Sequence, residues 1–168
     1  MSNSGVSLAF VVVLAMGCTD PRPTATEVRE PALSRAENAA RPISGTCQTS
    51  FAPPTLPPPP VIRQVDEGSC NLSHLGKAAL YSVEDIDVVA GTQRSVEFTL
   101  TAPNGDVLRV TTAGTNAPNA TGVDFEATMR FVGGTGRFAN AAGEAQVTGS
   151  ASFITNTAAF TVNGWIEY

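Results

Sequence analysis

Residues 123–153 read VDFEATMRFVGGTGRFANAAGEAQVTGSASF, and this stretch decides the fold. On both sides of its glycine-rich centre, apolar and polar residues alternate with a period of two. One face of the first half carries Val123, Phe125, Ala127, Met129 and Phe131. One face of the second half carries Ala145, Val147, Gly149, Ala151 and Phe153. Because this alternation is typical of β-strands with one buried face, the stretch predicts two strands joined by a short turn.

The glycine cluster at the centre, GGTGRF, must be distinguished from a phosphate-binding loop. A Walker-type loop requires GxxxxGK[ST], and the cluster has neither that spacing nor the lysine. A dinucleotide-binding loop requires a third glycine before a real helix, and GTGRFA lacks it. We therefore predict a structural turn formed by Gly133, Gly134, Gly136, Arg137 and Phe138. Within it, Arg137 is expected to pair with a carboxylate such as Asp124 rather than to bind a ligand.

Similar alternation recurs along most of the chain after Cys70. Further strands are predicted near residues 43–51, 60–68, 75–83, 96–101, 108–110 and 160–168. Asn104-Gly105 supplies a hairpin turn, since both positions favour positive φ. In the segment after residue 95, Val96, Phe98 and Leu100 are expected to face inward. About eight short strands with little helical periodicity indicate an all-β protein, either an antiparallel barrel or a sandwich.

Composition excludes some classes of partner. The chain has 168 residues, a formal net charge of −5 and a pI near 4.8, and it contains no run of Lys or Arg. It therefore lacks the basic footprint of a nucleic-acid-binding protein. No motif for a cofactor is present, and none is expected.

The N-terminus predicts export. Residues 8–16, LAFVVVLAM, form an apolar run that is too short to span a bilayer but suits an export signal. Gly17-Cys18 follows, and the segment resembles the lipobox of bacterial lipoproteins, in which the cysteine receives a diacylglycerol. This implies a signal peptide (1–17), a flexible tether (18–41) and a folded domain (42–168). The expected location is the cell envelope, at the outer membrane if the cell has one, and plain secretion is the alternative.

The three cysteines agree with export. If Cys18 carries lipid, Cys47 and Cys70 remain as an even pair, and an oxidising compartment favours a disulfide between them. A metal site is the weaker alternative, because these two distant cysteines lack the usual metal-ligand spacing.

The segment FVGGTGRFANAAGEAQVTG, together with SHLGKA, APNGDVLRVTTAGT and FTVNGWIEY, supports a family resemblance. These pieces resemble the allene oxide cyclase and dirigent barrel superfamily, and in particular its small exported bacterial members. The resemblance spans residues 43–168 and implies an eight-stranded antiparallel β-barrel, filled by side chains or holding one small ligand. Members often form dimers or trimers. No position matches the catalytic motif of the plant cyclases, so no catalytic residue is transferred.

Three functions remain open. The first is a binding module for a small apolar ligand, since inward Ala145, Gly149, Ala151 and Gly164 would leave room inside the barrel. The alternative is that the large inward residues Phe125, Met129, Phe131, Phe153 and Phe160 fill that space. The second is an isomerase or cyclase, which requires a buried carboxylate or Asn in the cavity. The third is a structural envelope protein that uses an exposed Trp165.

Two further groups of residues could form sites. His74, the single histidine, is interpreted as a strand-end residue satisfied by nearby backbone. Glu84, Asp85 and Asp87 are interpreted as a loop of solvated charges rather than a calcium site.

Overall fold

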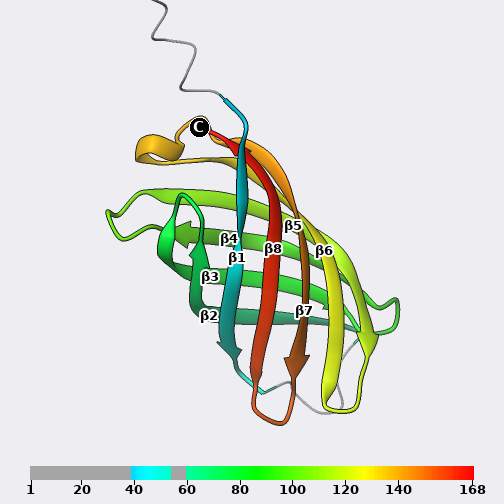
Figure 1. The fold of residues 1–168 in the computed structure, drawn as a ribbon. Coiled ribbons are helices and arrows are strands. Elements are labelled where there is room, and N and C mark those ends of the chain that lie inside the picture. Colours follow the sequence, from blue (N-terminus) through cyan, green and yellow to red (C-terminus); the bar gives the residue numbers. More distant parts are fainter. Residues whose placement is uncertain (1–38, 54–59) are drawn as a thin grey trace, which may run out of the picture. The chain divides into compact units, whose positions relative to one another are not determined.

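The computed structural model describes residues 39–53 and 60–168, which form one closed β-barrel (Figure 1). Each strand runs antiparallel to the next, and the last pairs with the first. The strands are β1 (Arg41–Phe51), β2 (Val61–Leu72), β3 (Gly76–Asp87), β4 (Thr92–Thr101), β5 (Val107–Pro118), β6 (Gly122–Gly134), β7 (Ala142–Ser152) and β8 (Thr157–Glu167). The predicted all-β, eight-stranded antiparallel barrel is confirmed. A sandwich is excluded, because β1 and β8 pair from Arg41↔Ile166 to Ser50↔Thr157.

The boundaries of the barrel lie close to the predicted ones. β1 begins at Arg41, one residue before the predicted domain start at residue 42. The predicted signal peptide, Cys18 and residues 19–38 of the tether lie outside the described residues. Within the described ranges, no helix is both long and apolar enough to cross a membrane.

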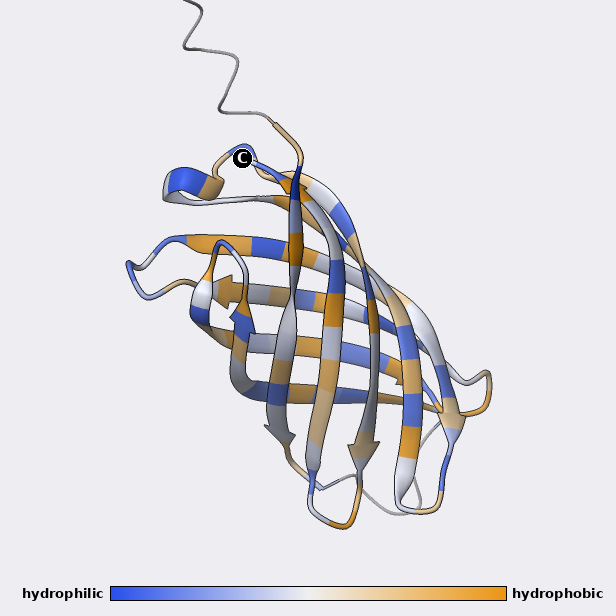
Figure 2. Cartoon of the chain, viewed as in Figure 1, coloured by the Kyte–Doolittle hydropathy of each residue, from blue (hydrophilic) through white to orange (hydrophobic). Residues whose placement is uncertain are grey.

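The alternating pattern that predicted β6 and β7 is visible in their packing. Ala127 lies opposite Val147 and Met129 opposite Ala145, and each of these four side chains is at most 5% exposed. Apolar and polar bands accordingly alternate along the ribbons in Figure 2. This alternation puts the apolar face of the sheet inside the barrel and leaves the outer face polar.

The two ends of the barrel are packed differently. Side chains from the start of each odd-numbered strand and the end of each even-numbered strand fill one end, which we call the closed end. Its fully buried members include Ile43, Leu100, Leu108, Phe138 and Ile166. We call the opposite end the open end. It carries the β3–β4, β5–β6 and β7–β8 turns. The large core therefore lies at one end and leaves space toward the other.

The glycine cluster lies at the closed end and connects β6 to β7. Gly133 and Gly134 end β6, and a short 3₁₀ turn, η2 (Gly136–Phe138), follows. Gly133 and Gly136 adopt φ of 88° and 54°, which side-chain-bearing residues rarely adopt. Phe138 is completely buried beneath the turn. The cluster is thus a tight connection that covers one end of the core.

Arg137 fixes this turn, although the predicted partner was wrong. Its side chain donates a hydrogen bond of 2.8 Å to the carbonyl of His74 and lies 3.7 Å from the carboxylate of Asp106. Asp124 instead accepts a hydrogen bond from Asn119. The reason is topological, because Asp106 precedes β5 at the closed end whereas Asp124 lies near the start of β6, toward the open end.

The predicted disulfide is present between β1 and β2. Cys47 and Cys70 face each other in the strand register, with a Cα–Cα distance of 4.0 Å. Both residues are 1% exposed, so the bond is part of the core.

Val96 is an exception to the predicted alternation. In the β3–β4 pairing, Val83 lies opposite Glu97 but Glu84 lies opposite Ser95, which leaves Val96 as an extra residue. Such a β-bulge resets the alternation, and Val96 points outward, 53% exposed. Before the bulge, β4 therefore directs polar Gln93 inward.

His74 and Trp165 lie on the outside of the barrel. His74 sits in the β2–β3 turn with φ of 69°, and its Nε2 atom is 3.1 Å from the carbonyl oxygen of Pro42. Trp165 is 44% exposed on the outer face of β8. Neither side chain faces the interior.

Candidate functional site

The open half of the barrel contains a cavity of about 500 Å³. A water molecule occupies roughly 30 Å³ of the liquid, and small-molecule sites are typically about 300 to 1,000 Å³. Most of its wall is apolar. Its apolar lining includes Ile62, Leu80, Ile86, Phe98, Val123, Phe125, Ala127, Met129, Val147, Ala151, Ala158 and Phe160. The barrel is therefore open inside and has room for one small ligand.

The space does not arise from all of the small residues that predicted it. The four small residues expected to leave room were Ala145, Gly149, Ala151 and Gly164, and of these only Ala151 lines the cavity. A Cβ atom at Gly149 would collide with Phe160, and one at Gly164 would collide with Ala145, so these glycines permit close packing. The large residues expected to fill the interior also differ in their positions. Phe125 and Phe160 pack edge to face at 6.0 Å on the cavity wall, whereas Phe153 lines the cavity from the β7–β8 turn, where it is 45% exposed.

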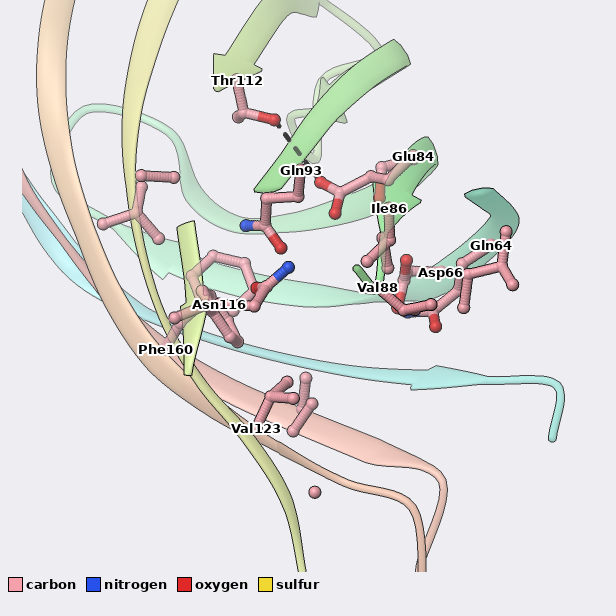
Figure 3. Close-up of a pocket in the computed structure, with 18 of the residues that line it drawn as sticks. Gln64, Asp66, Glu84, Ile86, Val88, Gln93, Thr112, Asn116, Val123 and Phe160 are labelled. Carbon is pink, nitrogen blue, oxygen red and sulfur yellow. Dashed lines mark hydrogen bonds between the residues drawn. The ribbon is translucent and has the colours of Figure 1, made fainter. Parts of the chain in front are cut away.

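One wall of the cavity is polar and is formed by β2 and β3. Gln64 lies opposite Glu84 in the strand register, and Asp66 lies opposite Ser82. All four line the cavity. Asp66 is only 6% exposed, and its carboxylate accepts a hydrogen bond of 2.9 Å from the Gln64 amide. Figure 3 shows Gln64, Asp66 and Glu84 together. The carboxyl groups of Asp66 and Glu84 thus lie on one wall of a mostly apolar interior.

The environment of these carboxyl groups favours their neutral forms. Burial raises the pKa of Asp66 to about 6, against the smaller opposing effect of the Gln64 hydrogen bond. Burial and the nearby charge of Asp66 raise the pKa of Glu84 to about 7, opposed by the hydrogen bond from Thr112. Thr112 donates that bond at 3.5 Å, drawn as a dashed line in Figure 3. A protonated carboxyl can donate a hydrogen bond, so at mildly acidic pH this wall offers donors to a ligand.

Further polar groups approach the same space from β4 and β5. Gln93 and Asn116 line the cavity, and both are labelled in Figure 3 among the side chains that surround it. The Oδ1 atom of Asn116 is buried and has no hydrogen-bond partner. Buried polar atoms are normally paired. This oxygen is therefore available to a donor on a ligand.

The interpretation of Glu84, Asp85 and Asp87 as a solvated loop was wrong. All three belong to the end of β3, and alternation separates them. Glu84 faces the cavity. Asp85 faces outward and binds Arg63 at 2.9 Å, and the hydrogen bond from Arg63 is the main reason that the pKa of Asp85 is lowered. Asp87 accepts hydrogen bonds from the backbone N–H groups of Val89 and Ala90 in the following turn.

The sequence therefore did not indicate Asp66, and it indicated Glu84 only as a solvated charge. In β2 the usual arrangement of apolar residues inside and polar residues outside is inverted, since Val61 and Val65 are 51% and 44% exposed while Gln64 and Asp66 point inward. A usable signal existed in β3, where Glu84 shares its parity with apolar Ala78, Leu80 and Ile86. In the described part of the chain, no three His, Cys, Asp or Glu side chains gather closely enough to hold a metal ion.

Comparisons with protein families, with curated proteins and with solved structures found no match to this chain. The resemblance to the allene oxide cyclase and dirigent superfamily stays a prediction. The chemistry of the cavity is accordingly the basis for a functional proposal.

Proposed function

We propose that this protein binds one small, mostly apolar molecule inside the barrel. The observation that carries the proposal is the cavity of about 500 Å³, whose wall is mostly apolar and includes the polar side chains of Gln64, Asp66, Glu84 and Asn116. Such sites bind by apolar contact and orient their ligand through a few polar groups.

The polar wall specifies what the ligand needs. Protonated Asp66 or Glu84 would donate to an acceptor such as a carbonyl or ether oxygen. The unpaired Oδ1 atom of Asn116 would accept from a hydroxyl or N–H group. An anionic ligand is disfavoured, because a negative group beside the two carboxyls would raise their pKa values further and find no cation among the lining residues.

A cavity-filling variant tests the proposal. Ala127 is 5% exposed and lines the cavity, so in Ala127→Phe the ring would occupy part of the ligand's space. Binding of the neutral fluorescent probe N-phenyl-1-naphthylamine is expected to weaken at least about tenfold, because apolar burial equivalent to about 1.4 kcal/mol or more is lost. Probe titration measures this effect.

Ala113→Phe is the matched control, because Ala113 is exposed on the outer face of β5. It is expected to bind the probe like the original protein. Native mass spectrometry of the purified protein gives an independent reading, since a bound molecule adds mass that disappears on denaturation. A protein that carries no added mass and binds no probe would contradict the proposal.

A second candidate, an isomerase that moves a proton on its bound substrate, is favoured by one observation. Two cavity carboxyls with pKa values near 6 and 7 can supply an acid and a base at neutral pH. If the protein is such an isomerase, it should catalyse exchange of the α-hydrogens of a long-chain ketone, such as 2-undecanone, with deuterium from D₂O. Deuterium uptake is expected to peak near pH 6 to 7 and to be lost in Glu84→Gln, which should still bind the probe. Exchange no faster than in buffer would remove this candidate.

We also propose that the protein is exported and anchored to the cell envelope through lipid on Cys18. The apolar run before Gly17-Cys18 supports this, as does the Cys47–Cys70 disulfide, which suits an oxidising compartment. Cys18→Ser should move the protein from the membrane fraction to the soluble fraction. Unchanged fractionation would contradict the anchor.

A further inference from the structure

Four large apolar side chains are exposed around the open end of the barrel. Val89 and Ile154 are 82% and 74% exposed, and Val88 and Phe153 are 44% and 45% exposed. They come from two turns, β3–β4 and β7–β8, and we call them the mouth rim. Figure 2 shows hydrophobic colour at both turns. Exposed apolar groups gathered at one end of a protein commonly mark an interaction surface.

The open end differs from the closed end in charge. Residues 88–91, 119–121 and 153–156, which form the three described turns of the open end, contain no charged residue. The sequence of the fourth connection, 52–60, has none either. The turns of the closed end carry Asp106 and Arg137. The turns of the open end thus lack the charges that two of the closed-end turns carry.

The two rim turns have backbone groups that are already paired. The carboxylate of Asp87 accepts hydrogen bonds from the backbone N–H groups of Val89 and Ala90, at 3.0 and 2.8 Å. In the other turn, Ser152 Oγ accepts from the N–H of Thr155 at 3.4 Å. Unpaired backbone groups are costly to bring into an apolar medium. These pairings lower that cost.

The mouth rim is continuous with the cavity, because Val88, Val89 and Phe153 line it as well as being exposed. An apolar ligand is concentrated in lipid and scarce in water. From this continuity we infer that the mouth rim docks on a lipid surface and that the ligand passes from the lipid directly into the barrel. This inference rests on the proposed function and adds the source of the ligand.

The charge of the protein further restricts which lipid head groups the mouth rim can dock on. The protein has a net charge of −5, and the rim turns offer no cation to anionic head groups. Attraction of a protein to anionic membranes requires basic residues near the surface. Docking is therefore expected on zwitterionic phosphatidylcholine, and added phosphatidylglycerol should weaken it.

Vesicle flotation of the full chain tests the inference. All proteins carry Cys18→Ser, so that no lipid anchor contributes and the N-terminal segment is the same throughout. Val89→Asp and Ile154→Asp are compared with Val96→Asp and Val132→Asp, whose side chains are 53% and 52% exposed away from the rim. We expect each rim variant to bind phosphatidylcholine vesicles at least about tenfold more weakly, while the two controls bind normally.

Probe binding is measured on the same proteins and separates the two proposals. If the Cys18→Ser protein without a further substitution binds the probe but not the vesicles, docking is overturned and the proposed function stands. If it binds the vesicles but not the probe, the proposed function is overturned and docking of the rim stands. Equal losses in rim and control variants would also overturn docking. So would a rim-dependent doubling of the native mass without vesicle binding, because the occupant of the rim would then be a second copy of the chain.

Discussion

The free energy of unfolding is expected to fall as the pH rises from about 4 to about 7, and Asp66→Asn should remove much of this fall. The pKa of Asp66 is raised from 3.8 to about 6 in the folded protein. Between these values the folded state binds more protons than the unfolded state, so its stability decreases with rising pH. A shift of about two units corresponds to about 3 kcal/mol.

Urea unfolding at pH 4 and at pH 8 measures this effect. Asn resembles the protonated carboxyl, so Asp66→Asn should match the original protein at pH 4 and exceed its stability by about 3 kcal/mol at pH 8. Glu84→Gln should act in the same direction, because its pKa is also raised. Glu97→Gln is the control, since Glu97 is exposed, and should change little. If Asp66→Asn is less stable than the original protein at pH 8, burial does not raise the pKa of this carboxyl.

Loss of the disulfide is expected to be the other large effect. Cys47 and Cys70 are 23 residues apart, and opening a loop of this length costs about 3 kcal/mol in the chain-entropy model. Both residues are also 1% exposed, so replacing them removes packed core atoms. The double variant Cys47→Ala/Cys70→Ala should therefore unfold at a markedly lower urea concentration.

Reductant separates the covalent effect from the packing effect. It should destabilise the original protein by about 3 kcal/mol and leave the double variant unchanged. If reductant has no effect on the original protein, the bond does not contribute to stability as expected.

The parts of the fold that could be predicted are those in which local pattern and global packing agree. Along Val123–Phe131 and its partner strand, every second residue is apolar. The alternation in the sequence and the burial in the structure therefore assign the same residues to the interior. The glycine turn could also be predicted, since positive φ at Gly133 and Gly136 is what glycine permits. The number of strands followed from the same regularity.

The candidate site could not be predicted because it breaks that pattern. Asp66 lies inside while Val65 lies outside, and the β-bulge at Val96 reverses the expected orientation of the preceding residues. Both features depend on pairing with strands elsewhere in the chain. Local departures from the rules of burial are expected at functional sites. In this barrel the inward carboxyl groups are such a departure.

The closing pair of strands has a consequence for folding. β1 pairs with β8, so Arg41 lies beside Ile166 although the two residues are separated by nearly the whole domain. Contacts between residues so distant in the chain slow folding, because a long segment must be ordered before they form. Until β8 pairs with β1, one edge of β1 exposes its backbone donors and acceptors to other chains, which promotes aggregation. The Cys47–Cys70 disulfide joins the other edge of β1 to β2 while β8 is still unpaired. The domain is thus expected to be most vulnerable while its last eleven-residue strand is still unpaired.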